Sequence, residues 1–185
     1  MNEILHFLTQ RSSASRLTEP APIGEELQAI FAAALRAPDH ARLRPWRFLS
    51  VSGERRIALG ELFREALLLR NPDADQAAQD KAANAPLRAP LVVVVVTRLA
   101  EHPKVPYVEQ RLSAGCAAHA ILLAAEALGY AGIWRTGEVA FDRNLMRMLG
   151  LADNEEIAGF VYLGTREGEV RPVPQLAVAG FVTDW

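Results

Sequence analysis

Apolar positions recur three and four residues apart in several long stretches of the chain. Residues at that spacing share one face of a helix, so these stretches predict amphipathic helices. The expected ranges are 2–10, 24–36, 54–69 and 107–128, with a short helix at 142–149 that Asp142 caps. A weaker and mostly polar pattern predicts one more helix within 71–84.

Shorter apolar runs predict strands at 48–51, 91–96, 130–134 and 157–163. The run 91–96 is apolar on both faces and rich in valine, which is typical of a strand at the centre of a sheet covered on two sides. The order of helices and strands predicts an α+β fold with a central mixed β-sheet flanked by helices. Residues 166–185 contain Pro172 and Pro174 and predict an extended arm.

The chain has 185 residues, the usual size of one domain, and it shows no repeat and no linker. We therefore expect a single domain over 1–185. The helix at 107–128 is predicted to be buried nearly all round, so it needs more cover than a small sheet offers. A subunit interface would supply that cover, and the sequence predicts a homodimer whose C-terminal arm is free to extend onto the partner subunit.

Composition and charge exclude several classes of function. Half of the residues are hydrophobic and the formal net charge is -2, so no overall positive field is available to hold a nucleic-acid backbone. The single cysteine, Cys116, cannot form a disulfide within the chain, and no secretion signal is evident. Glu126 and Gly129 interrupt the apolar stretch 112–134, which disfavours a membrane span. We expect a cytoplasmic protein without nucleic-acid or membrane partners.

An arginine-serine cluster follows the first predicted helix. It joins Arg11 to Ser12 and Ser13, with Ser15 and Arg16 close behind. Guanidinium groups bind phosphate oxygens in pairs and neighbouring hydroxyls complete the shell, so this loop is a candidate cradle for one phosphate ester. A solvated loop that caps a helix explains the same residues, and the pattern alone favours that simpler interpretation.

A second basic cluster lies between residues 36 and 47, where the net charge is +3 with His40 neutral. Its cations are Arg36, Arg42, Arg44 and Arg47. A surface loop with Trp46 in the core is the simple alternative.

The segment 132–137 reads Gly-Ile-Trp-Arg-Thr-Gly and ends a predicted strand. Small flanking residues, together with backbone N–H groups freed at a strand end, let a flat ring approach the main chain. A glycine-bounded turn explains the pattern equally well.

Other chemical motifs find no support. Cys116 and His119 lie three residues apart on one helix, but two ligands make no metal site and core packing is the expectation for both. Cys116 also lacks the electropositive surroundings of a reactive thiol. The sequence contains no G-x-S-x-G, P-loop or G-x-G-x-x-G motif, which disfavours nucleophile-elbow hydrolases, P-loop NTPases and ordinary Rossmann dehydrogenases.

Several segments taken together resemble one known family. They are RSSASR at 11–16, RAPDH at 36–40, Pro-Trp at 45–46, Ala-Pro at 89–90, SAGCAAHAILLAAEALGY at 113–130, GIWRTG at 132–137 and GFVYLGT at 159–165. From about residue 2 to residue 165 their order and spacing resemble the flavin-dependent nitroreductase family, and more narrowly its short NAD(P)H nitroreductase members. Their joint occurrence is specific where each segment alone is not.

The resemblance implies the nitroreductase-like fold, an intertwined homodimer with an FMN held between the subunits at each of two sites. On this resemblance Arg11, Ser12 and Ser13 would hold the phosphate and ribityl end of the flavin from one subunit. Arg16 is a further candidate for the phosphate.

The resemblance also implies that residues from both subunits reach one flavin. Arg36 and His40 would come from the partner subunit. Trp134, Arg135 and Thr136 would line the flavin pocket.

The activity implied is that of an NAD(P)H-dependent nitroreductase. NADH or NADPH would reduce FMN and leave, and a nitroaromatic, quinone or related electron-poor acceptor would then take two electrons in the same pocket. The flavin carries the chemistry, so no catalytic side chain and no metal is assigned. A flavoenzyme of the same fold with a different oxidant or a flavin-modifying activity, and a non-catalytic FMN-binding protein, stay open as alternatives.

The chain departs from the family pattern at two places. Where many members have a double Arg before the Ser, this sequence has Arg11 followed directly by Ser12. Arg42 and Arg44 replace the common Asn and Gln before Pro-Trp. The rim over the ring is therefore expected to be more cationic than usual, which favours anionic or strongly electron-poor acceptors.

Overall fold

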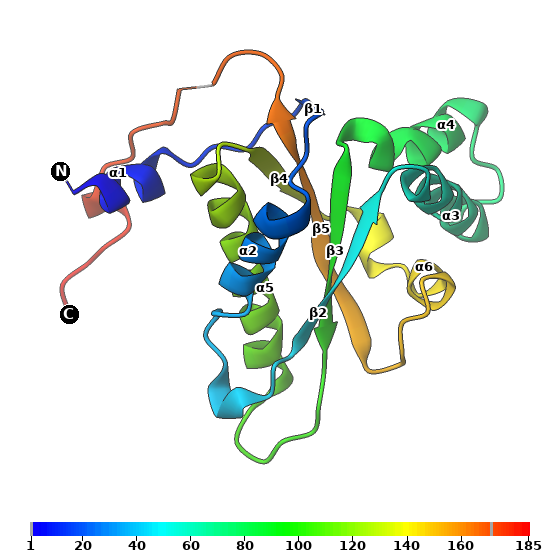
Figure 1. Ribbon diagram of the computed structural model, residues 1–185. Helices are drawn as coiled ribbons and strands as arrows, with labels where there is room; N and C mark the ends of the chain where they lie inside the picture. Colours follow the sequence, from blue (N-terminus) through cyan, green and yellow to red (C-terminus); the bar gives the residue numbers. More distant parts are fainter. Residues whose placement is uncertain (1, 171) are drawn as a thin grey trace.

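The structure is a computed structural model that describes residues 2–170 and 172–185. Figure 1 shows one β-sheet between two groups of helices. Helices α2 (Gly24–Ala34) and α5 (Tyr107–Ala127) pack on one face. Helices α3 (Arg55–Arg70) and α6 (Arg143–Met148) pack on the other, and α4 (Gln76–Asn84) packs against α3.

The sheet is built from five strands: β1 (Leu17–Thr18), β2 (Trp46–Ser52), β3 (Leu91–Arg98), β4 (Ala131–Arg135) and β5 (Glu155–Arg166). Their order is β1-β5-β3-β2, and β4 also pairs with β5. β3 is buried along nearly its whole length, as its valine run predicts. This confirms the α+β fold and the central position of the strand at 91–96.

The expectation of a mixed sheet was wrong, because every strand pair in the described residues is antiparallel. Ser52 at the end of β2 pairs with Leu91 at the start of β3, so both lie at the same end of this strand pair. The helices α3 and α4 form the connection, which leaves β2 and returns to β3 at that same end. The single helix α5 does make β3 and β4 run in the same direction, but β5 lies between them and is antiparallel to both.

A β-bulge in β5 fixes which side chains face each layer. Val96 pairs with Ile157 and Val95 with Gly159, so Ala158 is an extra residue without a partner on β3. Residues three apart in a regular strand face opposite sides, yet Ile157 and Phe160 pack in the same core cluster. Because of the bulge, Ile157 before it and Phe160 after it face the same core.

The helices follow the sequence pattern closely, because each depends on local periodicity and capping. The N-terminal helix α1 spans Glu3–Gln10, and Asp142 accepts a hydrogen bond from the N–H of Asn144 at the start of α6. The weak pattern at 71–84 forms a helix over its second half, as α4. The sequence patterns did not predict the two-residue β1 or the short 3-10 helices at His40–Arg42, Ala85–Arg88, Glu138–Phe141 and Val178–Gly180.

α5 differs from the expectation of a helix buried nearly all round. Ala114, Ala117 and Ile121 are fully buried, but Val108 and Leu112 on another face are 56% and 64% exposed. Within one chain the helix is thus covered on one side only. The surplus apolar surface that suggested a subunit interface is real, and it lies on this face.

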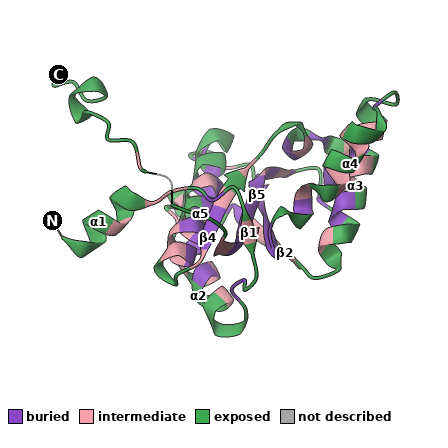
Figure 2. Cartoon of the chain, turned by 90° about the horizontal axis from the view of Figure 1, so that it is seen from above, coloured by how far each residue is buried: buried purple, intermediate pink, exposed green. Residues whose placement is uncertain are grey.

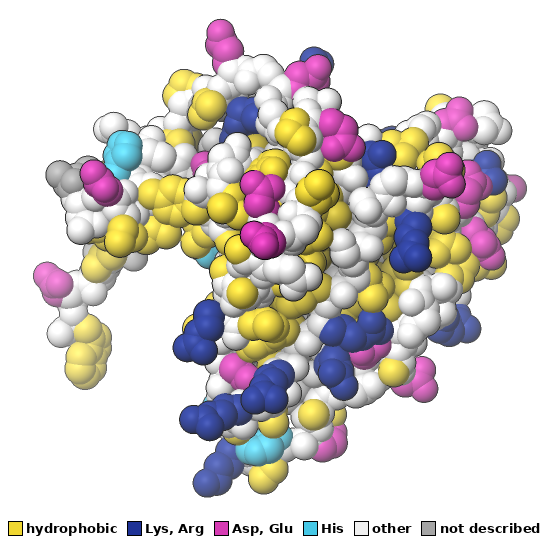
Figure 3. Space-filling view, viewed as in Figure 1, with side chains coloured by type: hydrophobic (Ala, Val, Ile, Leu, Met, Phe, Trp, Pro, Cys, Tyr) yellow, Lys and Arg dark blue, Asp and Glu magenta, His cyan; other side chains and the backbone are white. Residues whose placement is uncertain are grey.

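Both ends of the chain project from the globular body, as Figure 2 shows. Ile4 and Leu5 on α1 are 68% and 55% exposed, and none of the residues of α1 is buried. Arg171 lies outside the described residues; the rest of the segment after β5 contains no regular element except the 3-10 helix Val178–Gly180, and it exposes Phe181 and Trp185. Figure 3 shows hydrophobic side chains on this protruding part. Within residues 2–170 and 172–185, no helix has the length and apolar character to span a membrane.

Candidate active site

A cavity of about 1120 Å³ lies against the exposed side of α5. Several elements supply its apolar lining, among them α5 with Leu112, β4 with Trp134 and the 3-10 helix before α6 with Phe141. Arg36 stands at its edge. A hollow of this size with a mainly apolar lining and a few polar groups is typical of a small-molecule site.

The acidic group at the cavity is already neutralised. Arg111 donates hydrogen bonds of 2.7 and 2.8 Å to the two carboxylate oxygens of Glu156. These bonds hold the pKa of Glu156 below its ordinary value, so the carboxylate stays ionised and paired. Arg36 makes no ion pair within the described residues, and it gives the cavity edge a positive charge.

The β5 bulge seats Trp134 in the cavity. Its indole Nε1 donates a hydrogen bond of 3.3 Å to the carbonyl oxygen of Ala158. Gly159 has a φ of 157°, and a Cβ there would lie 2.0 Å from Trp134 Nε1. Across the ring, a Cβ at Gly115 would lie 3.4 Å from Trp134 Cη2, so the ring occupies a slot between β5 and α5.

Arg135 faces the other side of β4 from Trp134, because successive side chains of a strand alternate. Its guanidinium lies 5.8 Å from the ring centre of Tyr162, whose pKa is raised by burial. Its Nε is buried and has no hydrogen-bond partner in the described residues. Buried donors are nearly always satisfied in proteins, so this N–H is an exception within the single chain, on the side of β4 away from the cavity.

The glycines that flank this motif have structural roles. At Gly132, a Cβ would lie 2.7 Å from Leu122 Cδ2 and 2.8 Å from Leu163 Cδ2, so this glycine lets α5 pack closely on β4. Gly137 has a φ of 78° and forms the turn after the strand. Thr136 lies between that turn and β4 and is exposed. The interpretation of the glycines as space for a ring does not hold at Gly132.

The arginine-serine loop lies beside the same strand. The N–H of Ala14 donates a hydrogen bond of 3.1 Å to the carbonyl oxygen of Gly132 on β4. Arg166 Nη2 donates bonds of 3.1 Å to the carbonyl and hydroxyl oxygens of Ser12. Arg11 makes no ion pair within the described residues, and Ser13 is exposed. The loop is thus docked on the sheet while its cation stays available.

The RAPDH loop is attached to α5. His40 Nδ1 lies 2.7 Å from Glu109 Oε2, and the hydroxyl of Ser113 donates a hydrogen bond to the carbonyl oxygen of Pro38. The structure therefore brings Arg36 and Trp134 to one cavity. The other predicted site residues are not in the lining of that cavity within a single chain: Arg11, Ser12, Ser13, His40, Arg135 and Thr136.

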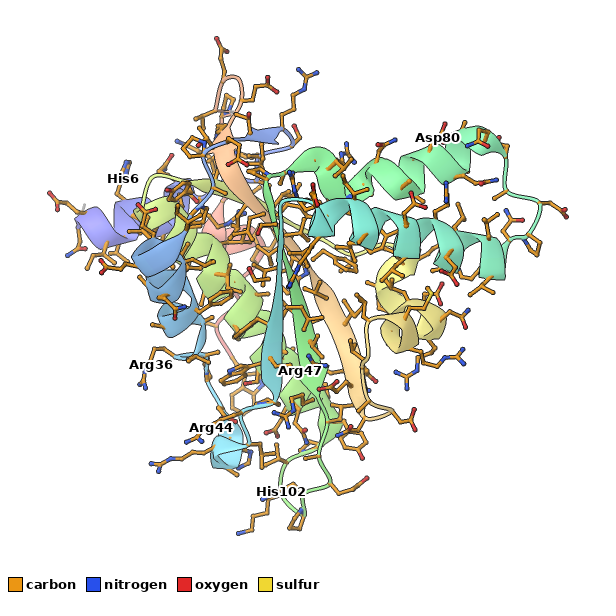
Figure 4. The ribbon with its side chains drawn as sticks, turned by 45° about the vertical axis from the view of Figure 1, so that its right-hand side comes forward. His6, Arg36, Arg44, Arg47, Asp80 and His102 are labelled. Carbon is orange, nitrogen blue, oxygen red and sulfur yellow. The ribbon has the colours of Figure 1, made fainter. Side chains whose placement is uncertain are left out.

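Arg47 belongs to a separate ion pair, not to the basic cluster in which the sequence placed it. Its guanidinium donates two hydrogen bonds of 2.6 Å to Glu155, which is 6% exposed. Hydrogen bonding to Arg47 holds the pKa of Glu155 below its ordinary value. Figure 4 shows Arg36 and Arg44 projecting outward, whereas Arg47 lies on β2. Trp46 is 6% exposed in the core, as the simple interpretation of this segment predicted.

The family model described as "Nitroreductase family" matches residues 8–165 of the chain. The chain belongs to the nitroreductase family. It is 44% identical over 163 residues to the protein named "Putative NAD(P)H nitroreductase YdjA" of Escherichia coli strain K12, which is 88% of this chain and 88% of that protein. Members of the nitroreductase family are oxidoreductases, and this assignment confirms the resemblance seen in the sequence.

Solved structures confirm the nitroreductase-like fold. The nitroreductase-like family protein from Bacillus cereus matches with a TM-score of 0.84 at 17% identity, covering 100% of this chain and 97% of that chain. The nitroreductase with bound FMN from Bacteroides fragilis matches with a TM-score of 0.74 at 22% identity, covering 100% of both chains.

In this nitroreductase Cys116 and His119 are exposed and line the cavity, so the expectation of core packing was wrong. Both lie on the surplus apolar face of α5, which an alanine-rich sequence does not distinguish from its buried face. No group of three or more potential metal ligands occurs among residues 2–170 and 172–185. The sequence analysis also missed Glu109 and Phe141, because neither belongs to a pattern that marks it before the loops are placed.

Proposed function

We propose that this nitroreductase is a homodimeric, FMN-dependent oxidoreductase that uses NAD(P)H to reduce nitroaromatics, quinones or related electron-poor acceptors. The observation that carries the proposal is the convergence of three features on β4. The loop with Arg11 docks on this strand, Trp134 extends from it into the apolar cavity, and Arg135 on it has a buried unpaired donor.

The residues present fit an FMN group. A phosphate needs cations and hydroxyl donors, and Arg11, Ser12 and Ser13 supply them on a loop that is already held in place. Arg16 lies on the same loop and has no ion pair within the described residues. The likeness to a solved nitroreductase with bound FMN supports the same ligand.

When bound, the flavin supplies the two-electron exchange between nicotinamide and acceptor. The chain's own residues bind and orient the ring and keep water from it. Trp134 and Leu112 provide apolar surface next to the ring, and the exposed side chain of Thr136 is a donor for its polar edge. Arg135 lies on the opposite side of β4 from Trp134 and contributes positive charge from behind the strand, which favours the anionic reduced ring.

The homodimer completes the site. α5 leaves Val108 and Leu112 exposed on one face, and covering that face with a second copy removes apolar area from water. Arg36 and His40 lie on the segment next to this face and would reach the flavin held by the partner subunit. The exposed apolar residues of α1 and of the arm at 166–185 would then pack on the partner.

Anaerobic spectroscopy of the purified chain tests the proposal. We expect a yellow protein, a solution mass twice the 20.3 kDa of one chain, bleaching by NADH or NADPH, and recovery of the colour when a nitroarene is added. A protein that takes up no FMN would contradict the proposal. A flavin that neither nucleotide bleaches would instead indicate a non-catalytic FMN-binding protein.

A further inference from the structure

A second hollow of about 690 Å³ adjoins the first one and has a very different lining. Four arginines surround it: Arg36, Arg42, Arg44 and Arg98. The remaining lining comes from Leu35, Ala37, Asp39 and Trp46. We call this hollow the arginine recess. Figure 3 shows Lys and Arg side chains gathered on the lower part of the same face.

The positive charge of the arginine recess is not neutralised within the described chain. Asp39 is the acidic residue of its lining, and its two carboxylate oxygens accept hydrogen bonds from the N–H groups of Leu43 (3.0 Å) and Arg44 (2.9 Å). Arg98 lies 3.7 Å from Glu155, which Arg47 already engages with two bonds. No described carboxylate pairs with the three other arginines.

The loop that carries Arg42 and Arg44 has a strained backbone conformation. Ala41, Arg42 and Arg44 have φ values of 60°, 55° and 50°, in the left-handed region that side chains with a Cβ rarely adopt. Such conformations persist only where surrounding contacts enforce them, and they occur preferentially at ligand sites. Here the two bonds to Asp39 and the contact of His40 with Glu109 hold the loop in this shape.

The arginine recess and the apolar cavity lie next to each other and share two lining residues. Arg36 and Ala37 line both hollows, so one ligand can place a flat ring against Trp134 and a charged arm among the arginines. Unpaired guanidinium groups select oxyanions with several acceptor oxygens, phosphate above all, because each offers paired N–H donors.

From these observations we infer that the arginine recess is an anion subsite, which binds the phosphate or carboxylate arm of a ligand whose ring enters the apolar cavity. This inference rests on the proposed function for the identity of the ring. Two ligands share the required chemistry: the pyridine nucleotide, through its phosphates, and an acceptor that carries an acidic group.

Titration calorimetry of the FMN-loaded protein with inorganic pyrophosphate tests the subsite directly. The variant Arg42→Ala/Arg44→Ala removes two charge-assisted contacts, so we expect pyrophosphate affinity to fall at least tenfold. Arg42→Lys/Arg44→Lys keeps the charge without the paired donors, so its pyrophosphate affinity should lie between that of the unaltered protein and that of Arg42→Ala/Arg44→Ala. The control Arg55→Ala/Lys81→Ala removes two charges from α3 and α4 and should bind as the unaltered protein does.

Steady-state kinetics then identifies the source of the anionic arm. If the arm belongs to the nucleotide, Arg42→Ala/Arg44→Ala raises KM for the nucleotide: equally for NADH and NADPH where the shared pyrophosphate is bound, and more for NADPH where its additional phosphate is bound. If it belongs to the acceptor, the ratio of kcat/KM for 4-nitrobenzoate to that for nitrobenzene falls at least tenfold. Either result supports the subsite.

Equal pyrophosphate affinity in the unaltered protein and Arg42→Ala/Arg44→Ala would overturn the inference, as would kinetics in which neither the KM values for the two nucleotides nor the acceptor preference changes. Circular dichroism excludes a variant that fails to fold. Failure of the proposed function looks different, because a protein without flavin can still be titrated with pyrophosphate.

Discussion

The two faces of the sheet differ in how completely they are closed. On the α3 and α6 face, Phe63 packs edge-on against Phe160 at 5.1 Å between ring centres, and Arg70 is bound to the buried Asp142. On the α5 face, Val108 and Leu112 remain 56% and 64% exposed, and Arg36 in the lining of the same cavity makes no ion pair within the described residues. The first face holds the fold together, and the second is left open for a partner and a ligand. Substitutions on the two faces should therefore give different phenotypes.

Leu112→Glu on the open face should have the largest effect, on assembly. Burying a leucine contributes about 1.5–3 kcal/mol, and a two-fold interface contains it twice, so dimerisation should weaken by about 3–6 kcal/mol. Sedimentation of diluted protein would show monomers with unchanged circular dichroism. If Leu112→Glu stays dimeric, this face of α5 is not the interface.

Phe63→Ala on the closed face should reduce the free energy of unfolding by about 3–5 kcal/mol, because it leaves a cavity next to Phe160. Urea denaturation of the FMN-free protein measures this change. Dimerisation and FMN affinity of the folded fraction should not change. A loss of flavin without a loss of stability would contradict the division between the two faces.

Arg11→Ala should weaken FMN binding ten- to a hundredfold, since a hydrogen bond to a charged group contributes about 1.5–3 kcal/mol. Fluorescence titration of the FMN-free protein measures the dissociation constant. Arg55→Ala, at the start of α3, is the matched control. Full retention of FMN by Arg11→Ala through dialysis would contradict the phosphate assignment.

The Glu155 pair predicts loss of stability in acid. Its pKa in the folded chain is lowered from 4.5 by Arg47, so the pair stabilises the fold fully above that value and the stabilisation is lost as the pH falls through the lower folded-state pKa. Chemical denaturation between pH 6 and about 3 should show this decline, and Glu155→Gln should make it shallower. An identical pH profile in both proteins would show that other groups govern acid unfolding.

Arg64→Ala should have the smallest effect. Arg64 pairs with Glu61 one turn away on the exposed side of α3, and such a pair contributes about 0.2–0.5 kcal/mol. Thermal unfolding at low and high salt measures the difference, which salt should remove. A change above about 1 kcal/mol would mean that this surface has a partner of its own.

The sequence predicted those features that depend on residues close together in the chain. It did not predict features that depend on the pairing of residues far apart in the chain. Helical periodicity placed α1 to α6, and the valine run identified β3, because both patterns are local. The antiparallel sheet depends on which strand lies between β3 and β4, which no local pattern contains.

The same limit applies to the candidate site. Arg47 seemed equivalent to Arg42 and Arg44 in the sequence, but Glu155 lies 108 residues further along the chain and removes Arg47 from the group. Cys116 and His119 lie in an alanine-rich helix whose two faces look alike until the sheet covers one of them. Of the segments that carried the family resemblance, the fold docks the loop at 11–16 on β4, which itself carries Trp134, and it attaches the loop at 36–40 to α5.

The bulge at Ala158 determines how β5 would respond to deletion of that residue. Loss of one residue from a strand ordinarily exchanges its inner and outer side chains, but here the surplus residue is the one that breaks the alternation. A chain shortened by Ala158 would keep Ile157 and Phe160 inside as a regular strand. It would lose the carbonyl that anchors the indole of Trp134 and the surface that Ala158 gives to the cavity lining, so the damage would fall on the candidate site and not on the alternation of the core.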